Sequence, residues 1–391
     1  MHALGIGLAA LPLIVWTYLI AARGGFWVEP LRLSPAARRS GPPPAGGGAP
    51  RRIVAVIPAR DEADVIGAAV ESLLRQEMPG SLHIIVVDDG SSDGTAAAVT
   101  RAAGSVGAPA RLSVISGAPP PAGWTGKLWA MSQGVAASAR LSPDYLLFTD
   151  ADIHHDPGSV GALVASAEAG GRDLASLMVR LSAETFAERA LIPAFVFFFF
   201  LLYPPAWIAS PRRRTAGAAG GCMLIRPQAL ARCGGLAAIR SAIIDDCALA
   251  AAVKGSGGSV SLALTRGARS LRPYGSFAEI GRMISRTAFN QLRHSYGLLT
   301  LTLVGLVVTY GLAPLLLLTG RPLPMLLGAT AWALMTLAYR PIVRFYGLGI
   351  LWSLTLPAAA AFYCGATLHS AIAYRRGRGG MWKGRAQDVE I

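Results

Sequence analysis

The stretch Ile84-Ile-Val-Val-Asp-Asp-Gly-Ser-Ser-Asp-Gly-Thr95 decides the fold, because an apolar, β-branched run ends there in acidic residues and glycines. Such a run predicts a buried strand followed by a tight turn. Similar runs occur upstream at Ile53-Val-Ala-Val-Ile57 and downstream at Tyr145-Leu-Leu-Phe148, with helix-like stretches between them. The alternation of strands and helices predicts an α/β domain with a mainly parallel sheet.

Each of these predicted strands ends in a polar cluster. The clusters are Ala59-Arg-Asp-Glu62, Asp88-Asp89 and Thr149-Asp-Ala-Asp152. Ligands of open α/β sheets bind beyond the carboxyl ends of the strands. We therefore expect the acidic side chains of the three clusters to converge on one edge of the sheet.

The composition indicates a membrane protein. Of the 391 residues 53% are hydrophobic and only 15% are charged, which is more apolar surface than one soluble domain normally buries. The net charge of +14 includes arginines that flank apolar segments, as at 212–214, and these suit an anionic cytoplasmic leaflet. We find no helix-turn-helix, RNA-binding or zinc-site pattern, so nucleic acid is not an expected partner. The four cysteines have no C-x-x-C spacing, which agrees with a reducing cytosolic environment.

The hydrophobic pattern predicts five regions. We expect an N-terminal membrane anchor at 1–27, a linker rich in Pro, Gly and Arg at 28–50, a catalytic domain at 51–295, membrane helices at 296–374 and a basic tail at 375–391. Within the catalytic domain, the apolar segment 191–209 is broken by prolines and predicts an interfacial helix or hairpin.

The number of crossings in the C-terminal region is open. Candidate spans lie at 298–318, 323–339 and 345–374, and the last contains Pro357 and can form a hairpin. Three crossings would put the arginine-rich tail outside, whereas two or four would keep it in the cytosol. We expect a multi-pass protein of the inner (cytoplasmic) membrane with the catalytic domain and the tail in the cytoplasm.

Asp150 and Asp152 are the first candidate site residues. Two carboxylates two residues apart, directly after a strand, can hold one hard divalent cation, Mg²⁺ or Mn²⁺, that in turn binds a diphosphate. The alternative is a solvated turn or a helix cap.

Other polar residues also suit a ligand site. A carboxylate beside the glycine turn at Asp89 can accept hydrogen bonds from a base or a sugar, while Asp93 can cap the next helix. Lys127 stands on a glycine turn and suits a phosphate or a carboxylate, or is a solvated surface lysine. Asp245-Asp246 follows two isoleucines, and one of these acids can serve as a general base; the alternative is a pair at a helix N-cap.

In this order, Ile57-Pro-Ala-Arg-Asp-Glu62, Val86 to Thr95, Gly126-Lys127, Thr149 to Asp152, Gly220-Gly221 and Asp245-Asp246 resemble the family 2 glycosyltransferases of the GT-A fold. The resemblance covers about residues 51 to 295. It implies a Rossmann-like catalytic domain and a nucleotide-sugar donor.

A narrower resemblance extends over nearly the whole chain. Gly123-Trp-Thr-Gly-Lys-Leu-Trp129, Ala219-Gly-Gly-Cys-Met-Leu224 and Ser270-Leu-Arg-Pro-Tyr274 look like the hopene-associated glycosyltransferases. This similarity implies a hopanoid or related polyprenoid acceptor.

The family resemblance also implies roles for single residues. Asp89, with Glu62 nearby, matches the position that binds the nucleoside, and Lys127 the lysine near the donor. Asp150 and Asp152 match the metal-binding pair, Asp246 the catalytic base with Asp245 before it, and Gly220 and Gly221 the boundary between acceptor and donor.

One departure from the family pattern concerns processivity. The Q-x-x-R-W motif of processive relatives is absent, and the region reads Arg282-Met-Ile-Ser-Arg286-Thr-Ala-Phe-Asn-Gln-Leu-Arg293. We expect Arg286, or alternatively Arg293, at the diphosphate. We therefore expect a membrane-bound, metal-dependent, inverting enzyme that transfers a sugar from a nucleotide to a lipid. The alternatives are a polyprenyl-phosphate glycosyltransferase and an inactive, lipid-binding GT-A protein.

Overall fold

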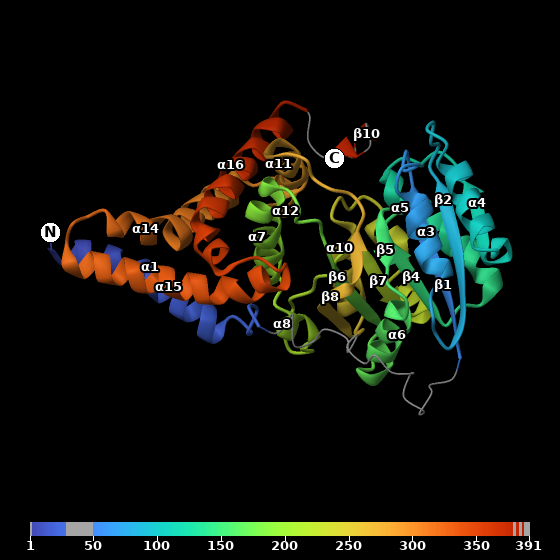
Figure 1. Cartoon of the computed structure of the whole chain (residues 1–391), viewed down its shortest axis with the longest axis horizontal. Coiled ribbons are helices and arrows are strands. Elements are labelled where there is room, and N and C mark those ends of the chain that lie inside the picture. Colours follow the sequence, from blue (N-terminus) through green and yellow to red (C-terminus); the bar gives the residue numbers. More distant parts are fainter. Residues whose placement is uncertain (1, 29–49, 378–380, 383–384, 387–391) are drawn as a thin grey trace. The chain divides into compact units, whose positions relative to one another are not determined.

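The computed structural model describes residues 2–28, 50–377, 381–382 and 385–386, which form two compact units (Figure 1). A helical unit contains residues 2–28, 183–206 and 274–377, and an α/β unit contains residues 50–182 and 207–273. The chain thus leaves the α/β unit at residue 183, returns to it at residue 207 and leaves it again at residue 274. Residues 29–49 of the expected linker, and most of the expected basic tail, lie outside the described residues.

An eight-stranded sheet forms the α/β unit, with strand order β3-β2-β1-β4-β7-β6-β8-β5. The strands are β1 (Arg51–Ala59), β2 (Gly80–Asp88), β3 (Leu112–Ser116), β4 (Tyr145–Thr149), β5 (Ile153–His155), β6 (Leu174–Arg180), β7 (Cys222–Ile225) and β8 (Val260–Ser270). A separate pair is formed by β9 (Met381–Trp382) and β10 (Arg385–Ala386).

The sheet is mixed, which corrects the expectation of a mainly parallel one. Strands β3, β2, β1 and β4 are parallel to one another, and β6 is parallel to β8. However, β7 is antiparallel to both its neighbours and β5 is antiparallel to β8. These two strands have four and three residues. Runs so short show no period, and the direction of a strand depends on its partners rather than on its own composition.

The two faces of the sheet are covered by different helices. Ile53, Ala55 and Ile57 of β1 share one core with α3 (Ile66–Leu74), α4 (Thr95–Ser105) and α6 (Ser159–Ala169). Alternate residues of a strand point to opposite faces, so Val56 faces the other side, toward α5 (Gly126–Ser138). A Cβ atom on Gly134 of α5 would lie 2.4 Å from Cγ1 of Val56. Glycine therefore allows α5 to pack directly on the sheet.

The rest of the α/β unit consists of short helices. They are η1 (Pro109–Arg111), η2 (Ala139–Leu141), α9 (Pro227–Arg232), η3 (Leu236–Ile239) and α10 (Asp245–Gly255), and α8 (Pro205–Ala209) crosses the boundary between the units.

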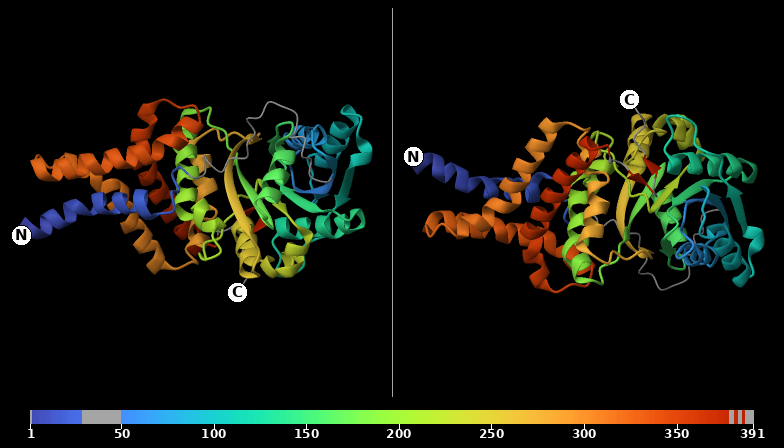
Figure 2. Two further views of the ribbon diagram at one scale, coloured as in Figure 1. Left: turned by 90° about the horizontal axis from the view of Figure 1, so that it is seen from below. Right: turned by 90° about the horizontal axis from the view of Figure 1, so that it is seen from above.

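The helical unit is built from long apolar helices (Figure 2). Its elements are α1 (His2–Ala22), α7 (Phe186–Leu202), α11 (Phe277–Ser285), α12 (Ala288–Gln291), α13 (Tyr296–Leu306), η4 (Val307–Gly311), α14 (Leu312–Leu317), α15 (Pro322–Phe345), η5 (Ile350–Thr355) and α16 (Leu356–Arg375).

Helix α7 lies in the interior of the helical unit. The ring of Phe197 contacts those of Trp16, Phe26 and Tyr339, with centroids 5.2–6.5 Å apart. These contacts join α7 to α1 and α15. The helix begins with a capping box in which Thr185 and Glu188 bind each other's backbone N–H groups.

In the part of the chain that the structure describes, four helical segments are long and apolar enough to cross a membrane: Phe186–Ala209, Tyr296–Leu317, Pro322–Phe345 and Ile350–Arg375. The first overlaps the segment that we expected to be interfacial, and the other three overlap the predicted C-terminal spans. Pro357 lies in the first turn of α16, where a missing N–H costs nothing, rather than inside a continuous helix. The anchor expected at the N-terminus is helical, but its apolar part Ile6–Ala22 is shorter than these segments.

Candidate active site

Strands β1 and β2 end side by side, because Ala59 is paired with Asp88 in register. The next residue, Asp89, is 3% exposed, and its N–H donates to the carbonyl of Ala59 (2.8 Å). Arg60 Nη1 donates to the carbonyl of Asp89 (2.7 Å) and lies 3.4 Å from its Oδ2. The carboxylate that the sequence associates with a nucleoside is thus held in place by the neighbouring strand end.

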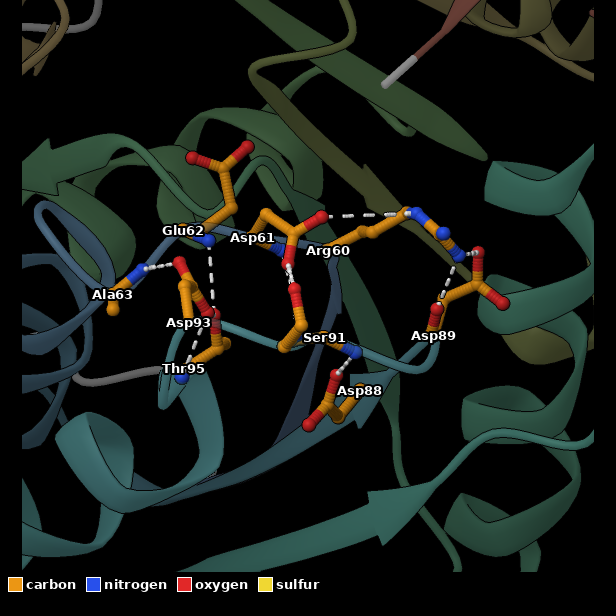
Figure 3. A network of polar contacts seen from close by, with 10 residues as sticks. Arg60, Asp61, Glu62, Ala63, Asp88, Asp89, Ser91, Asp93 and Thr95 are labelled. Atoms are coloured by element: carbon orange, nitrogen blue, oxygen red, sulfur yellow. Dashed lines mark hydrogen bonds and ion pairs between the residues drawn. The ribbon is translucent and has the colours of Figure 1, made fainter. Parts of the chain in front are cut away.

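The turn after Asp89 is connected to the β1 end by polar contacts (Figure 3). Asp93 Oδ2 accepts the N–H of Ala63 (2.9 Å), and its Oδ1 accepts from the N–H (3.0 Å) and hydroxyl (2.6 Å) of Thr95. The Thr95 hydroxyl in turn accepts the N–H of Glu62 (2.9 Å). The hydrogen bond from the Thr95 hydroxyl is the main cause that lowers the pKa of Asp93. The N-cap residue of α4 is Gly94, but Asp93 still accepts the N–H of the first helical residue.

The Glu62 side chain points away from Asp93 and Thr95 (Figure 3). Its carboxylate forms an ion pair with the guanidinium of Arg272, which follows β8. This contact joins the β1 end of the site to the segment after β8.

That segment also holds the second carboxylate of the Asp150-Ala-Asp152 motif. Asp152 Oδ2 accepts the hydroxyl of Ser270 (2.8 Å), and the Asp152 carbonyl accepts the N–H of Leu271 (2.7 Å). Burial, and then the charge of Asp150, raise the pKa of Asp152. The two carboxylates are therefore close enough to repel each other.

Lys127 connects this motif to the start of α10. It lies in the first turn of α5, whose N-cap Thr125 accepts the N–H of Leu128. Lys127 Nζ is 3.0 Å from Asp150 Oδ1 and 3.1 Å from Asp245 Oδ2. Burial opposes the charged form, but the carboxylates of Asp150, Asp245 and Asp246 outweigh it and raise the pKa of Lys127. Lys127 is therefore a paired cation within the cluster and not a solvated surface lysine.

Asp246 is held by two backbone donors. Its Oδ2 accepts the N–H of Gly220 (2.8 Å) and its Oδ1 the N–H of Cys247 (2.7 Å). Burial and the charge of Asp245 raise the pKa of Asp246, although Lys127 opposes the shift. The N-cap of α10 is Ile244, so the two aspartates lie in the first turn rather than at the cap. A carboxylate with a raised pKa and a fixed orientation is suited to accept a proton near neutral pH.

Gly220 and Gly221 reach the site because β7 is antiparallel to β4. Cys222 pairs with Thr149, so the start of β7 lies beside the end of β4. A Cβ atom on Gly220 would lie 3.3 Å from Asp246 Oδ2 and 3.5 Å from Lys127 Nζ. Gly221 accepts a hydrogen bond from the Thr149 hydroxyl at its carbonyl (2.8 Å). Close backbone approach is the physical reason for glycine at 220.

The structure therefore joins most of the predicted site residues through direct contacts within the α/β unit. Lys127 contacts Asp150 and Asp245, Gly220 contacts Asp246, and Glu62 is connected through Arg272 to the Asp152 segment. Arg286 belongs to the helical unit, at the C-cap of α11.

Asp150 and Asp152 are the residues of this site that could hold a divalent cation. Among the described residues no group of three or more His, Cys, Asp or Glu side chains is arranged to hold a metal. Two neighbouring carboxylates can nevertheless hold Mg²⁺ or Mn²⁺ when diphosphate oxygens and water supply the other ligands. A cation there would also offset the burial and the charge of Asp150, which together raise the pKa of Asp152.

Three residues of the site were not assigned from the sequence: Arg60, Ser270 and Arg272. Arg60 stands in the first predicted polar cluster, and the other two stand in the Ser270-Leu-Arg-Pro-Tyr274 motif. Their partners Asp89, Asp152 and Glu62 are 29, 118 and 210 positions away in the sequence. The motifs were visible, but nothing local indicated their partners.

Comparison with known proteins agrees with this architecture. The model of a family described as "Glycosyl transferase family 2" matches residues 54–234, and the α/β unit has a GT-A-like fold. None of the curated proteins that were compared matches the chain in sequence.

One solved structure is similar in fold over most of this chain. The mannosyltransferase PcManGT from Pyrobaculum calidifontis, in complex with GDP-Man and Mn²⁺, is similar over 93% of this chain and 98% of its own, with a TM-score of 0.55 and 17% identity. Glucosyl-3-phosphoglycerate synthase from Mycobacterium tuberculosis covers 62% of this chain and 79% of its own, with a TM-score of 0.38 and 18% identity.

Proposed function

We propose that this protein is a membrane-bound, inverting glycosyltransferase that moves a sugar from a nucleotide-sugar donor to the hydroxyl of a lipid. The observation that carries the proposal is the Asp246 carboxylate, which two N–H groups orient beside Asp245 and Lys127. The family match over residues 54–234 supports the sugar chemistry.

The proposed reaction is a single displacement at the anomeric carbon. The acceptor oxygen forms a bond to that carbon while the bond from the carbon to the diphosphate oxygen breaks. Asp246 takes the proton of the acceptor hydroxyl, and its raised pKa makes it a stronger base than an ordinary carboxylate. Asp89 and Glu62 bind the nucleoside end of the donor.

A divalent cation held by Asp150 and Asp152 would neutralise the charge that develops on the departing nucleoside diphosphate. Ser270 holds the Asp152 carboxylate through its hydroxyl (2.8 Å). Lys127 holds Asp150 and Asp245 in place and keeps an ammonium group near the diphosphate.

The charge of the site favours a hydroxyl acceptor over a phosphate acceptor. Asp150, Asp245 and Asp246 surround Lys127, so the surroundings of the base carry a net negative charge. A polyprenyl phosphate would be repelled there and would need no general base. The four apolar helices and the subfamily resemblance support a lipid acceptor, for which we propose a hopanoid or related polyprenoid on the cytoplasmic side of the inner membrane.

The test is thermal stabilisation of the purified protein by UDP-, GDP- and dTDP-sugars, with Mn²⁺ and with EDTA. We expect one nucleotide class to raise the melting temperature and EDTA to remove the effect. That donor, radiolabelled in its sugar, is then supplied with lipid extracts to detect transfer. No stabilisation across the panel would contradict a donor site and favour an inactive, lipid-binding protein.

The same donor also separates the two acceptor classes. The product is treated with mild acid, which cleaves a sugar phosphate linked to a polyprenol but leaves a simple glycoside of a lipid alcohol intact. An acid-labile product whose formation is insensitive to Asp246→Asn would overturn the hydroxyl acceptor in favour of a phosphate.

A further inference from the structure

The segment from Trp207 to Thr215 begins in α8 and continues as a loop, and the half-buried ammonium group of Lys254 holds it in shape. Lys254 Nζ donates to the carbonyls of Trp207 (3.0 Å), Ile208 (2.7 Å) and Thr215 (2.7 Å). These contacts tie both ends of the loop to the last turn of α10. The ordering of the loop is thus part of the fold of the α/β unit and needs no ligand.

The loop displays positive charge. Arg212, Arg213 and Arg214 are all exposed, and the Arg213 guanidinium lies 4.8 Å from the centre of the Trp207 ring. The sequence has no acidic residue between Glu188 and Asp245. The charge of the loop is therefore not balanced by nearby acidic residues in the sequence.

The composition of the loop matches a bilayer surface better than it matches a soluble anion. Tryptophan and arginine are enriched at membrane interfaces, where the ring lies at the headgroup level and the guanidinium contacts phosphate. Each basic residue near an anionic leaflet contributes on the order of 1 kcal/mol. Three adjacent arginines can thus make a strong preference for anionic lipid.

We propose that the loop 207–215 is a docking surface for anionic phospholipid headgroups. The assignment rests on the complementary charges of the three arginines and of anionic headgroups. The hydrogen bonds from Lys254 keep the arginines on one ordered loop. Because α10 also carries Asp245 and Asp246 at its first turn, the helix that holds the loop is the helix that positions the proposed base. The proposal assumes the membrane association suggested above but not the sugar chemistry.

The experiment is hydrogen–deuterium exchange of the full-length protein in nanodiscs of phosphatidylcholine, with and without phosphatidylglycerol. We expect loop amides to exchange up to about 100-fold more slowly in the anionic discs at low salt. Arg212→Gln/Arg214→Gln should reduce this ratio to about fivefold. Arg101→Gln/Arg140→Gln, which removes two exposed arginines elsewhere in the α/β unit, should leave it unchanged.

Several outcomes would overturn the proposal. They are equal exchange in both kinds of disc, an equal loss in the two double variants, or the same slowing by inorganic phosphate or duplex DNA added to neutral discs. Lys254→Met should speed exchange of the loop in every disc, since it releases the three carbonyls. Stabilisation by nucleotide sugars, measured on the same variants, should be unaffected, and this separates failure of the docking surface from failure of the donor site.

Discussion

Two acidic groups of the site differ in their surroundings. The first is centred on Asp93 in the turn after β2, and the second comprises Asp150, Asp245 and Asp246 around Lys127. Around Asp93, the N–H groups of Ala63 and Thr95 and the hydroxyl of Thr95 supply hydrogen bonds, and Arg60 lies beside Asp89. In the second group, Asp150 and Asp245 share the ammonium of Lys127. Burial and the charge of Asp245 raise the pKa of Asp246.

The difference separates a scaffold from a reactive centre. The Asp93 carboxylate accepts three hydrogen bonds, so it stabilises the turn and needs no ligand. In the second group three carboxylates surround a single ammonium group, so like charges lie close to one another. Carboxylates whose pKa values are perturbed in this way are typical of functional sites. Substitutions should therefore lower stability at the first group and lower activity, or change its pH dependence, at the second.

The largest expected effect is that of Asp246→Asn on sugar transfer. An amide cannot accept the proton of the acceptor, so we expect the rate to fall about 1,000-fold. The measurement is the initial rate of transfer from the donor found by thermal stabilisation, with the melting temperature as a check of folding. A loss below about tenfold would remove Asp246 from the role of base.

Lys127→Met should destabilise the protein strongly. The substitution leaves Asp150 and Asp245 without their shared ammonium, and breaking a partly buried ion pair costs about 3 kcal/mol. Melting temperatures at pH 7 and at pH 5 measure the effect, which should shrink at pH 5 because Asp246, whose pKa is raised to about 6, is then protonated and leaves less negative charge around position 127. Arg75→Met, which breaks an exposed pair with Glu71, is the control and should cost less than about 1 kcal/mol.

The raised pKa of Asp246, to about 6, predicts opposite trends for stability and activity. Between about pH 4 and pH 6 the folded protein binds more protons at this group than the unfolded chain, so stability should fall as pH rises. Activity should rise with pH through about 6, because the base must be ionised. The check is melting temperature and transfer rate against pH; an equal slope of stability in Asp246→Asn would contradict the assignment.

Ser270→Ala should raise the Mn²⁺ concentration needed for half-maximal stabilisation by about tenfold. The hydroxyl that orients Asp152 is lost, and such supporting contacts typically change metal affinity by 10–100-fold. The measurement is the Mn²⁺ concentration at half-maximal stabilisation by the donor. Ser105→Ala, which removes a hydroxyl from the end of α4, should leave that concentration unchanged.

The smallest expected effect is that of Thr95→Val in the first group. The variant loses a buried hydroxyl that bridges Asp93 and the Glu62 N–H, at a cost of about 1–2 kcal/mol in stability. The transfer rate at low temperature should remain near that of the wild type. A loss of activity as large as that of Asp246→Asn would erase the distinction between the two groups.

The convergence of acidic clusters could be predicted because each follows an apolar run, and both signals lie within a few neighbouring residues. Thr149 to Asp152 and Asp88-Asp89 were therefore placed at strand ends from local pattern alone. The same logic located the apolar helices, since length and composition are local properties.

Tertiary structure alone decided which residues meet. The antiparallel pairing of β7 with β4 brings Gly220 to Asp246, and the end of β8 brings Ser270 to Asp152 and Arg272 to Glu62. It also placed α7 inside the helical unit, although α7 interrupts the α/β unit in the sequence. Local patterns record the preference of a segment for burial, whereas its partners are selected by packing and by the pairing of charges across long separations in the chain.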